Sequence, residues 1–239
     1  MKKATTALLA AALATSAQAK ELDASNPVAV DIGGYAWFND LSGDIRTDIR
    51  DDDINTRRQI NDSATSGVFY GKLEHYVWFL PNLYVAQTFL NHEARDVTGS
   101  RVTLDYTHTD LDLYYNALDH EIAKISLGLG ARIYSGQVQS VILPDSPDIN
   151  NVLPMFYGYA QFNSFVDGLS LNIETLIGSN GGDDNYDYRG EVRYVTPVSL
   201  GLSLGYRYLD GKLDDKKRNV RLRSDQEFKG VYFGLSFHL

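Results

Sequence analysis

Residues 102–134 have the sequence VTLDYTHTDLDLYYNALDHEIAKISLGLGARIY, and this stretch decides the fold. In its second half, apolar residues occupy every other position from Ala123 to Ile133 and alternate with polar residues and glycine. The first half alternates in the same way around Leu111 and Leu113. Successive side chains of a β-strand point to opposite faces, so the stretch predicts two long strands joined by a short turn, each with one apolar and one polar face.

The same alternation recurs along the whole chain. Ten segments carry it, at about 28–38, 68–78, 83–91, 102–116, 122–134, 152–163, 169–177, 186–194, 200–208 and 231–239. Most have about ten residues, the length that spans a bilayer when the strand is tilted, whereas strands of soluble proteins commonly have about 5–6. Strand length therefore favours a membrane barrel over a soluble sandwich, which would alternate as well.

The connections between these segments alternate in length. Tight turns such as 80–82 follow the second, fourth, sixth and eighth segments, and longer polar connections, including 39–66 and 210–226, follow most of the others. A membrane barrel has short periplasmic turns and long extracellular loops, whereas a sandwich has no reason for this asymmetry. The sequence thus predicts an all-β, ten-stranded antiparallel transmembrane β-barrel with both ends of the chain on the periplasmic side.

The N-terminal residues predict export. A basic start at 1–3, a mostly apolar run at 4–14 and the small residues Ala17-Gln18-Ala19 are typical of a secretory signal peptide. We expect a signal peptide at 1–19 and an outer-membrane barrel domain at 20–239. The formal net charge of −9 argues against nucleic-acid binding, and the absence of cysteine excludes disulfides.

Aromatic residues near both ends of the segments predict girdles at the membrane interfaces. Trp78 and Phe79 lie near the expected periplasmic ends, and Phe38, Phe69 and Tyr106 lie near the loop ends.

The face opposite the apolar one carries many charges. In a soluble sandwich this face would be the solvated outside, whereas in a barrel it is the lumen, where acids and bases of different strands can pair. We expect a lumenal polar network made of Lys72, Glu74, His108, Asp110, Asp112, Lys124, Arg132, Glu174, Arg189, Glu191, Arg193 and Arg207.

Several short motifs together resemble a known family. They are Gly33-Gly34 and the segments 108–115 (HTDLDLYY), 153–158 (LPMFYG), 205–207 (GYR) and 230–235 (GVYFGL). As a set they resemble the small Gram-negative outer-membrane β-barrel proteins named for a Gly-Gly motif, over essentially the whole chain after the signal. The resemblance implies a location in the outer membrane of a Gram-negative bacterium and a barrel architecture, and it brings no assigned activity.

The end of the chain differs from the usual pattern of outer-membrane barrels, which typically close with Phe or Trp as part of the signal for the assembly machinery. Here the last residues are Phe237-His238-Leu239. We expect recognition by that machinery to depend on Phe237, Phe233 and Tyr232.

His108, Asp110 and Asp112 are of the residue types that outer-membrane proteases use at a barrel rim. They lie on one line of the lumenal face, where residues two apart are separated by about 7 Å, too far for the hydrogen bonds that acid–base catalysis needs. We therefore expect a packing network with Arg132 and Lys124 across the hairpin, and we nominate no catalytic residues.

Two charged clusters fall in expected loops. The acidic one could bind a divalent cation through its oxygens, but no EF-hand spacing is present, so we expect a solvated acidic surface and no metal or cofactor. The basic one could contact lipopolysaccharide phosphates or could balance its acidic neighbours in solvent. The acidic cluster consists of Asp48, Asp51, Asp52 and Asp53 with Asp183 and Asp184, and the basic one of Lys216, Lys217, Arg218, Arg221 and Arg223.

These features predict an integral outer-membrane protein with a structural or surface role, or a narrow porin-like channel, and not an enzyme. Two alternatives stay open: an outer-membrane hydrolase acting on protein or lipid, and a surface-binding protein acting through its extracellular loops. The expected partners are outer-membrane lipid, lipopolysaccharide and, during biogenesis, the barrel assembly machinery, with no nucleic acid and a monomeric state.

Overall fold

The computed structural model describes residues 27–49, 54–96, 101–140, 148–149, 151–217 and 220–239. The expected signal peptide at 1–19 lies outside these residues. Among the residues described, no helix is long and apolar enough to cross a membrane.

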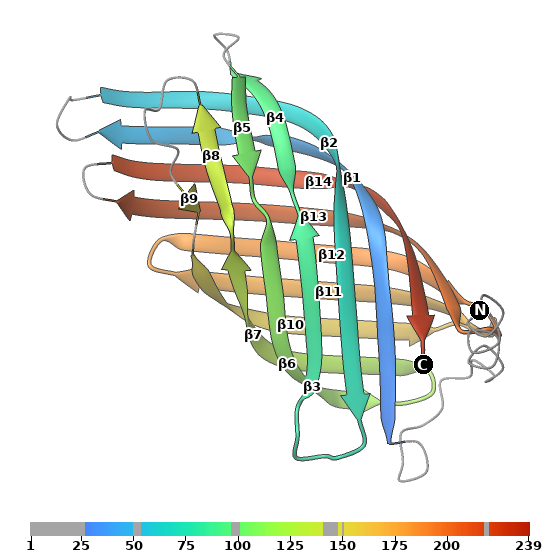
Figure 1. Cartoon of the computed structure of the whole chain (residues 1–239). Coiled ribbons are helices and arrows are strands. Elements are labelled where there is room, and N and C mark those ends of the chain that lie inside the picture. The colour runs from blue at the N-terminus through green and yellow to red at the C-terminus, as the bar shows by residue number, and fades with distance from the viewer. Residues whose placement is uncertain (1–26, 50–53, 97–100, 141–147, 150, 218–219) are drawn as a thin grey trace, which may run out of the picture.

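Ten antiparallel strands form a closed barrel (Figure 1). In their order around the ring they are β1 (Val28–Ile49), β2 (Ile54–His75), β3 (Asn82–Phe89), β6 (His108–Asp119), β7 (Ala123–Tyr134), β10 (Val152–Asn163), β11 (Leu169–Asn180), β12 (Asp183–Val195), β13 (Leu200–Lys217) and β14 (Val220–His238). The ring closes because β1 pairs with both β14 and β2. The predicted all-β, ten-stranded antiparallel fold is confirmed.

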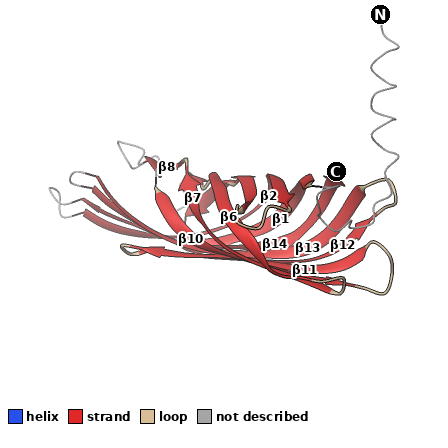
Figure 2. Ribbon diagram, turned by 90° about the horizontal axis from the view of Figure 1, so that it is seen from below, coloured by secondary structure: helices blue, strands red, loops and turns tan. Residues whose placement is uncertain are grey.

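The two ends of the barrel differ. At one end, called here the turn end, tight connections join β2 to β3, β6 to β7, β10 to β11 and β12 to β13. At the other, the hairpin end, β1, β2, β13 and β14 extend well beyond the ring, and four short strands continue the sheet from the extension of β2 (Figure 1). These are β4 (Asn91–Asp96), β5 (Arg101–Asp105), β8 (Gly136–Ser140) and β9 (Asp148–Ile149). Figure 2 shows from below that β2 lies across the barrel from β11.

Two connections that the sequence predicts as long polar loops are largely strand. β1 continues to Ile49 and β2 begins at Ile54, and β13 and β14 likewise extend from both sides into the segment 210–226. Beyond the ring the pattern reverses, because the outward face meets water: Leu41 and Ile45 are buried inside, and Asp40 and Arg46 are exposed outside. The sequence-based prediction required apolar outward residues, so it placed the ends of these strands too early.

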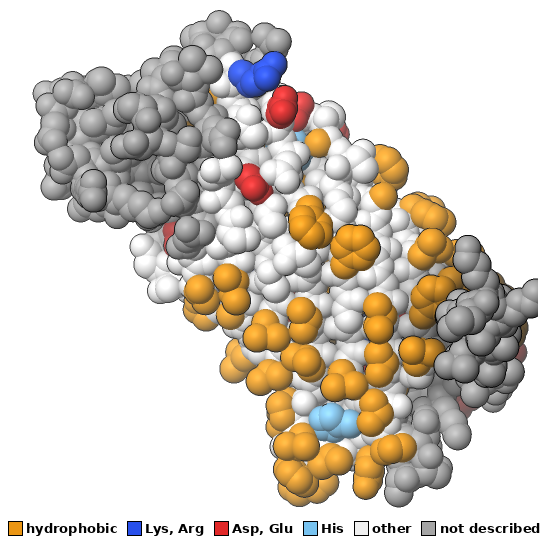
Figure 3. Space-filling model, viewed as in Figure 1, with side chains coloured by type: hydrophobic (Ala, Val, Ile, Leu, Met, Phe, Trp, Pro, Cys, Tyr) orange, Lys and Arg blue, Asp and Glu red, His pale blue; other side chains and the backbone are white. Residues whose placement is uncertain are grey.

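The outward face of the ring is an apolar belt. Figure 3 shows hydrophobic side chains over the lower part of the face on which β2 and β3 lie, down to the bottom edge. Exposed charges at Asp40 and Lys229 limit the belt at the hairpin end. Exposed apolar side chains of the belt include Ile32, Phe38, Phe69, Leu113, Leu129, Phe156, Ile173, Val192, Leu204, Phe233 and Phe237.

One aromatic residue assigned to the girdle is placed differently. Tyr106 lies inside the barrel at 2% exposure, with its ring centroid 5.5 Å from that of Phe228. The alternation fails as a guide here because Tyr106 and Thr107 lie in the break between β5 and β6.

Leu129→Arg tests the belt. Leu129 lies near the middle of β7 and is 71% exposed, so an arginine there should lower the free energy of unfolding by about 2–4 kcal/mol when the barrel is in a bilayer. The measurement is urea unfolding in lipid vesicles, with Leu129→Ala as the matched control for the lost side chain. Equal losses in the two variants would show that this face does not meet lipid.

Candidate functional site

The interior of the barrel holds the candidate site. The side chains of all twelve residues of the predicted polar network lie inside, and Arg132, His108 and Asp112 have no exposed surface. A charge removed from water costs several kcal/mol unless a partner of opposite charge and further hydrogen bonds compensate it. The arrangement of the interior therefore depends on which partner each charge finds.

Asp187 on β12 accepts hydrogen bonds from two arginines. Arg207 on β13 donates to it from Nε at 3.0 Å and Nη2 at 2.6 Å, and Arg132 on β7 donates from Nη2 at 2.6 Å. Arg132 also binds Asp110 through two bonds of 2.6 and 2.9 Å, and its Nη1 donates to Asn185 at 2.6 Å. This chain of acids and arginines joins β6 and β7 to β12 and β13 across the barrel.

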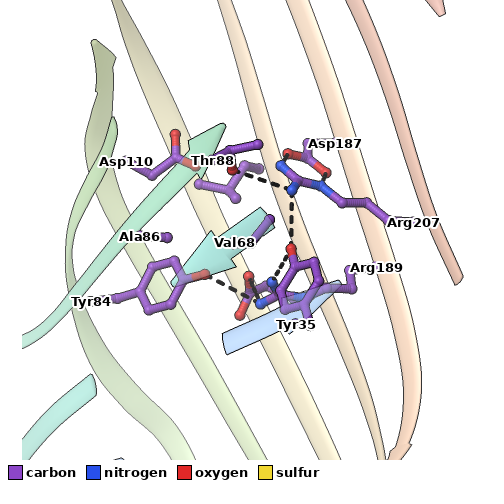
Figure 4. A pocket seen from close by; sticks show the side chains of 11 residues that line it. Tyr35, Val68, Tyr84, Ala86, Thr88, Asp110, Asp187, Arg189 and Arg207 are labelled. Atoms are coloured by element: carbon purple, nitrogen blue, oxygen red, sulfur yellow. Dashed lines mark hydrogen bonds and ion pairs between the residues drawn. The ribbon is translucent and has the colours of Figure 1, made fainter. Parts of the chain in front are cut away.

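Arg207 continues the connection to the opposite wall (Figure 4). Its Nη1 donates to Tyr35 on β1 at 3.0 Å and to Thr88 on β3 at 3.3 Å. Its guanidinium lies 4.7 Å from the ring centre of the buried Trp37. Arg189 also donates to the Tyr35 hydroxyl, at 2.9 Å, so one tyrosine bridges two arginines.

A second cluster forms around Glu174 on β11. Lys72, from β2 across the lumen, donates to it at 3.2 Å, and Arg189 donates to its other oxygen. Arg189 also reaches the Tyr84 hydroxyl at 3.3 Å. The Lys72 ammonium lies 3.7 Å from the centre of the Tyr159 ring, a cation–π geometry. Glu174 thus ties β2, β11 and β12 together at the middle of the lumen.

A third cluster lies nearer the turn end. Arg193 on β12 donates to Glu191 at 2.9 Å, to Asp31 on β1 at 2.8 Å and to the Tyr70 hydroxyl on β2 at 3.0 Å. Tyr232 on β14 donates to Glu191 at 2.8 Å. Three strands, β12, β1 and β2, therefore meet at one guanidinium, and β14 joins them through Glu191.

Lys124 is placed differently from the sequence-based expectation, which put it with Asp110 and Asp112 across the hairpin. It pairs with Asp119 in the backbone register beside the turn, far from those acids. Its ammonium instead binds Glu74 on β2, which also accepts a hydrogen bond of 3.0 Å from Tyr114.

Asp112 is the exception in this interior. It is fully buried, and neither carboxylate oxygen has a hydrogen-bond partner among the described residues. Its neighbour across the β6–β7 pair is Gly130, where a Cβ atom would collide with the carboxylate. Glycine is therefore needed at 130 to leave room for Asp112.

His108 takes part in no acid–base pair. Its Nδ1 donates to the Tyr106 carbonyl at 2.8 Å, and its Nε2 lies 3.9 Å from Asp110, beyond hydrogen-bond distance. Asp110 is occupied by Arg132. His108, Asp110 and Asp112 line one face of β6 as predicted, and the structure does not bring them together as a catalytic unit.

Toward the hairpin end, large apolar side chains fill part of the lumen. Rings from opposite walls meet there: Tyr106, just before β6, packs on Phe228 of β14 and bonds the Ser224 hydroxyl. The buried side chains of this layer, called here the hairpin-end core, are Leu41, Ile45, Ile60, Leu90, Val102, Leu104, Tyr106 and Phe228. Buried polar side chains lie at the same end of the barrel, among them Asn39, His92, Ser224 and Gln226.

A histidine–aspartate pair lies beside the hairpin-end core. His92 Nδ1 is 3.1 Å from Asp62, and its Nε2 is 2.7 Å from the Asn39 amide oxygen. Burial lowers the pKa of His92, and the hydrogen bond to Asp62 opposes that shift. Because both ring nitrogens are engaged and the ring is 1% exposed, His92 joins β4 to β1 and β2 and has no free nitrogen to offer a substrate.

A small cavity remains between the first two clusters (Figure 4). Its volume of about 10 Å³ is room for about one water molecule. The lining residues are Tyr35, Val68, Tyr84, Ala86, Thr88, Asp110, Glu174, Leu176, Asp187, Arg189 and Arg207.

The acidic residues predicted for the loops fall into three groups. Asp51, Asp52 and Asp53 lie outside the described residues, and Asp48 is in β1 with no side chain described. Asp183 is buried at the start of β12, next to the half-buried Asp184, and accepts from the Asp214 backbone at 2.6 Å. No group of three or more His, Asp or Glu side chains in the described part of the chain is placed to hold a metal ion.

Four of the five basic residues predicted for the last loop lie in β13 or β14 instead. Lys216 pairs with Arg221 in the backbone register of β13 and β14, and Arg223 Nε is 3.9 Å from Asp214. Arg218 lies outside the described residues, and the side chains of Lys216, Lys217 and Arg221 are not described.

Sequence reasoning missed several interior residues. Asp187 and Asp31 hold the same alternating positions as the charged residues of the predicted network. The same sequence pattern could therefore have identified them. The tyrosine hydroxyls of Tyr35, Tyr70 and Tyr84 were missed because an aromatic residue has no polar signature in an alternating pattern, although each binds an arginine.

Asp187→Asn and Asp112→Asn form a matched pair of variants at buried carboxylates. Loss of the Asp187 charge leaves two arginines undercompensated, so we expect the free energy of unfolding to fall by about 3–5 kcal/mol. Asp112 has no partner to lose, so its amide variant should be equally or more stable than the wild type. Urea unfolding in detergent micelles measures both, and equal destabilisation would contradict the pairing described above.

Comparisons with known proteins give information about the fold of this chain only. A scan against models of protein families finds no match, and neither does a search of curated proteins. The Gly-Gly family therefore stays a prediction from the sequence.

Among solved structures, the chain is similar to the outer membrane protease OmpT from Escherichia coli, with 11% identity and a TM-score of 0.50 over 87% of this chain and 97% of that one. It also matches the translocator domain of the autotransporter NalP from Neisseria meningitidis, with 7% identity and a TM-score of 0.47 over 98% and 95%. Neisserial surface protein A matches with 13% identity and a TM-score of 0.36 over 87% and 97%. At such low identity, the likeness to OmpT shows that the two proteins share the barrel fold.

Proposed function

We propose that this protein is an integral barrel of a Gram-negative outer membrane with a structural or surface role and a lumen that does not conduct. The observation that best supports this proposal is that side chains from opposite walls of the barrel meet along the described lumen. Lys72 reaches Glu174, Arg207 reaches Thr88, and Tyr106 packs on Phe228. About eight strands leave an interior just filled by side chains, and here large tyrosines and arginines fill the space that ten strands enclose.

The asymmetry of the two ends supports an orientation. Outer-membrane barrels have short turns in the periplasm and long hairpins outside the cell, so the turn end would face the periplasm. The hairpin end would then present an ordered platform above the membrane. The tip of the β13–β14 hairpin, with Lys216 and Arg221 paired in register, would lie where lipopolysaccharide phosphates could accept charge-assisted hydrogen bonds.

A hydrolase is the alternative that the likeness to OmpT raises, since that protein is a protease. Catalysis requires a base with a free nitrogen or oxygen within reach of a substrate. His92 and His108 are both buried, and the carboxylates beside them bind arginine or histidine. These contacts support a non-enzymatic role.

Single-channel recording tests the closed lumen. We expect wild-type protein in planar bilayers to give no discrete conductance steps, because ion pairs and the hairpin-end core block the path. Co-flotation of the protein with lipid vesicles provides the control for insertion. Reproducible steps from protein that co-floats would establish a channel and refute the closed lumen.

Incubation with peptides and phospholipids tests the non-enzymatic role. We expect no hydrolysis above buffer by the folded, vesicle-inserted protein. Asp62→Asn is the informative variant, because Asp62 is 25% exposed, lies at the hairpin end and binds His92. Turnover by the wild type that disappears in Asp62→Asn would reverse the assignment and identify a rim site.

A further inference from the structure

The carboxyl group of Asp112 is buried in the lumen without a partner. It has no exposed surface, and neither of its oxygens makes a hydrogen bond to any residue that the structure describes. Each lysine and arginine of the polar network already binds another carboxylate, so the network leaves no base for Asp112. The pairs are Lys72 and Arg189 with Glu174, Lys124 with Glu74, Arg132 with Asp110 and Asp187, Arg193 with Asp31 and Glu191, and Arg207 with Asp187.

Aromatic rings and glycine surround this carboxyl on the strand ladder. Asp112 pairs in the backbone register with Tyr84 of β3 on one side and Gly130 of β7 on the other. The rings of Tyr84 and of Tyr114, two residues along β6, both contact the ring of Tyr157, with centroid distances of 5.4 and 5.3 Å. The hydroxyl groups of these three tyrosines bind other residues of the lumen, namely Arg189, Glu74 and Glu174. None of them is a donor to Asp112.

The paired charges of the lumen balance without Asp112. Six bases bind six carboxylates in the pairs named above, so the set is neutral. An ionised Asp112 would add a negative charge that no partner compensates, and a protein interior stabilises such a charge poorly. A protonated carboxyl has no charge and leaves only a polar group unpaired, which costs much less. The form that fits the closed lumen is therefore the neutral acid.

The charged groups that act on Asp112 come from four strands. They are Asp110 on the same strand, Arg132 on β7, Glu174 on β11 and Lys72 on β2. Lys72 lies in the same row of the sheet as Asp112, two strands away, or about 10 Å. Its ammonium crosses the lumen to Glu174, at 3.2 Å. An ionised Asp112 would therefore compete with Glu174 for Lys72 and with Asp110 for Arg132.

We propose that Asp112 is a buried proton-binding site, which holds its proton while the lumen is closed. When the O–H bond breaks, the proton passes to hydroxide and forms water, and the new carboxylate draws Lys72 away from Glu174. A contact that crosses the lumen is thereby loosened. This inference rests on the closed lumen proposed above, and it adds the condition under which that lumen opens. A monovalent cation held by an ionised Asp112 is the competing occupant.

Infrared spectroscopy tests the proton directly. The protein is folded in phosphatidylcholine vesicles at neutral pH, and the wild type is compared with Asp112→Asn, which has the shape of the neutral acid. We expect the wild type to show the carbonyl stretch of a protonated carboxyl and Asp112→Asn to lack it. Glu74→Gln removes a paired carboxylate, so this matched control should keep the band.

A wild type without this band at neutral pH would overturn the proton site and favour the bound cation. If Asp112→Asn does not fold, the wild type alone is compared at neutral and alkaline pH. The band should then disappear as the pH rises, and a band that persists wherever the protein stays folded would contradict a proton that can be released.

Single-channel recording at rising pH tests the effect on the lumen. We expect the wild type to be silent at neutral pH and to give discrete conductance steps at alkaline pH, whereas Asp112→Asn should stay silent throughout. Equal opening of the two proteins, or a wild type that stays silent while it remains folded, would refute the switch. Steps from the wild type already at neutral pH would refute the closed lumen itself, and the infrared band would still report whether Asp112 holds a proton.

Discussion

A buried charge must be paired, and the inside of this barrel follows from that constraint. Asp187 accepts hydrogen bonds from two guanidiniums, and Arg193 donates to residues of two other strands. Such networks add little net stability compared with an apolar core, but a missing partner is costly, so they select one arrangement of the strands over its neighbours. Because a shift of one residue would turn every interior charge toward the apolar outward face, the network and the strand register specify each other.

The outside of the barrel obeys a complementary rule. Polar groups that face hydrocarbon need a partner within the protein. Gln87 and Thr109 are outward residues of adjacent strands, and Thr109 donates to the Gln87 amide oxygen at 2.6 Å while Gln87 donates to the His108 carbonyl at 3.2 Å. An otherwise apolar surface therefore tolerates this pair.

The strand alternation made the closed fold and the direction of side chains predictable, because a period of two is a local property that any window of a strand displays. Partners across the lumen were not predictable in this way. Lys124 binds Glu74 and not its neighbours on the hairpin, since strand tilt and the position of the turn decide which residues share a level. The extensions of β1 and β14 were missed because at Asn39 and Lys229 the apolar side changes from outward to inward. Residues such as Leu41 and Phe228 then mark the interior, and this reversal in the sequence indicates where the apolar belt ends.

The seam between β1 and β14 joins the beginning of the barrel to its end, from Asp31 beside His238 to Ile49 beside Val220. Contacts so distant in sequence carry the entropy of closing nearly the whole chain. Until β14 pairs with β1, both strands expose an unpaired edge and Glu191 lacks its hydrogen bond from Tyr232, so an open barrel can mispair with other chains. The pairing of the first strand with the last is thus what leaves the ring without an unpaired edge.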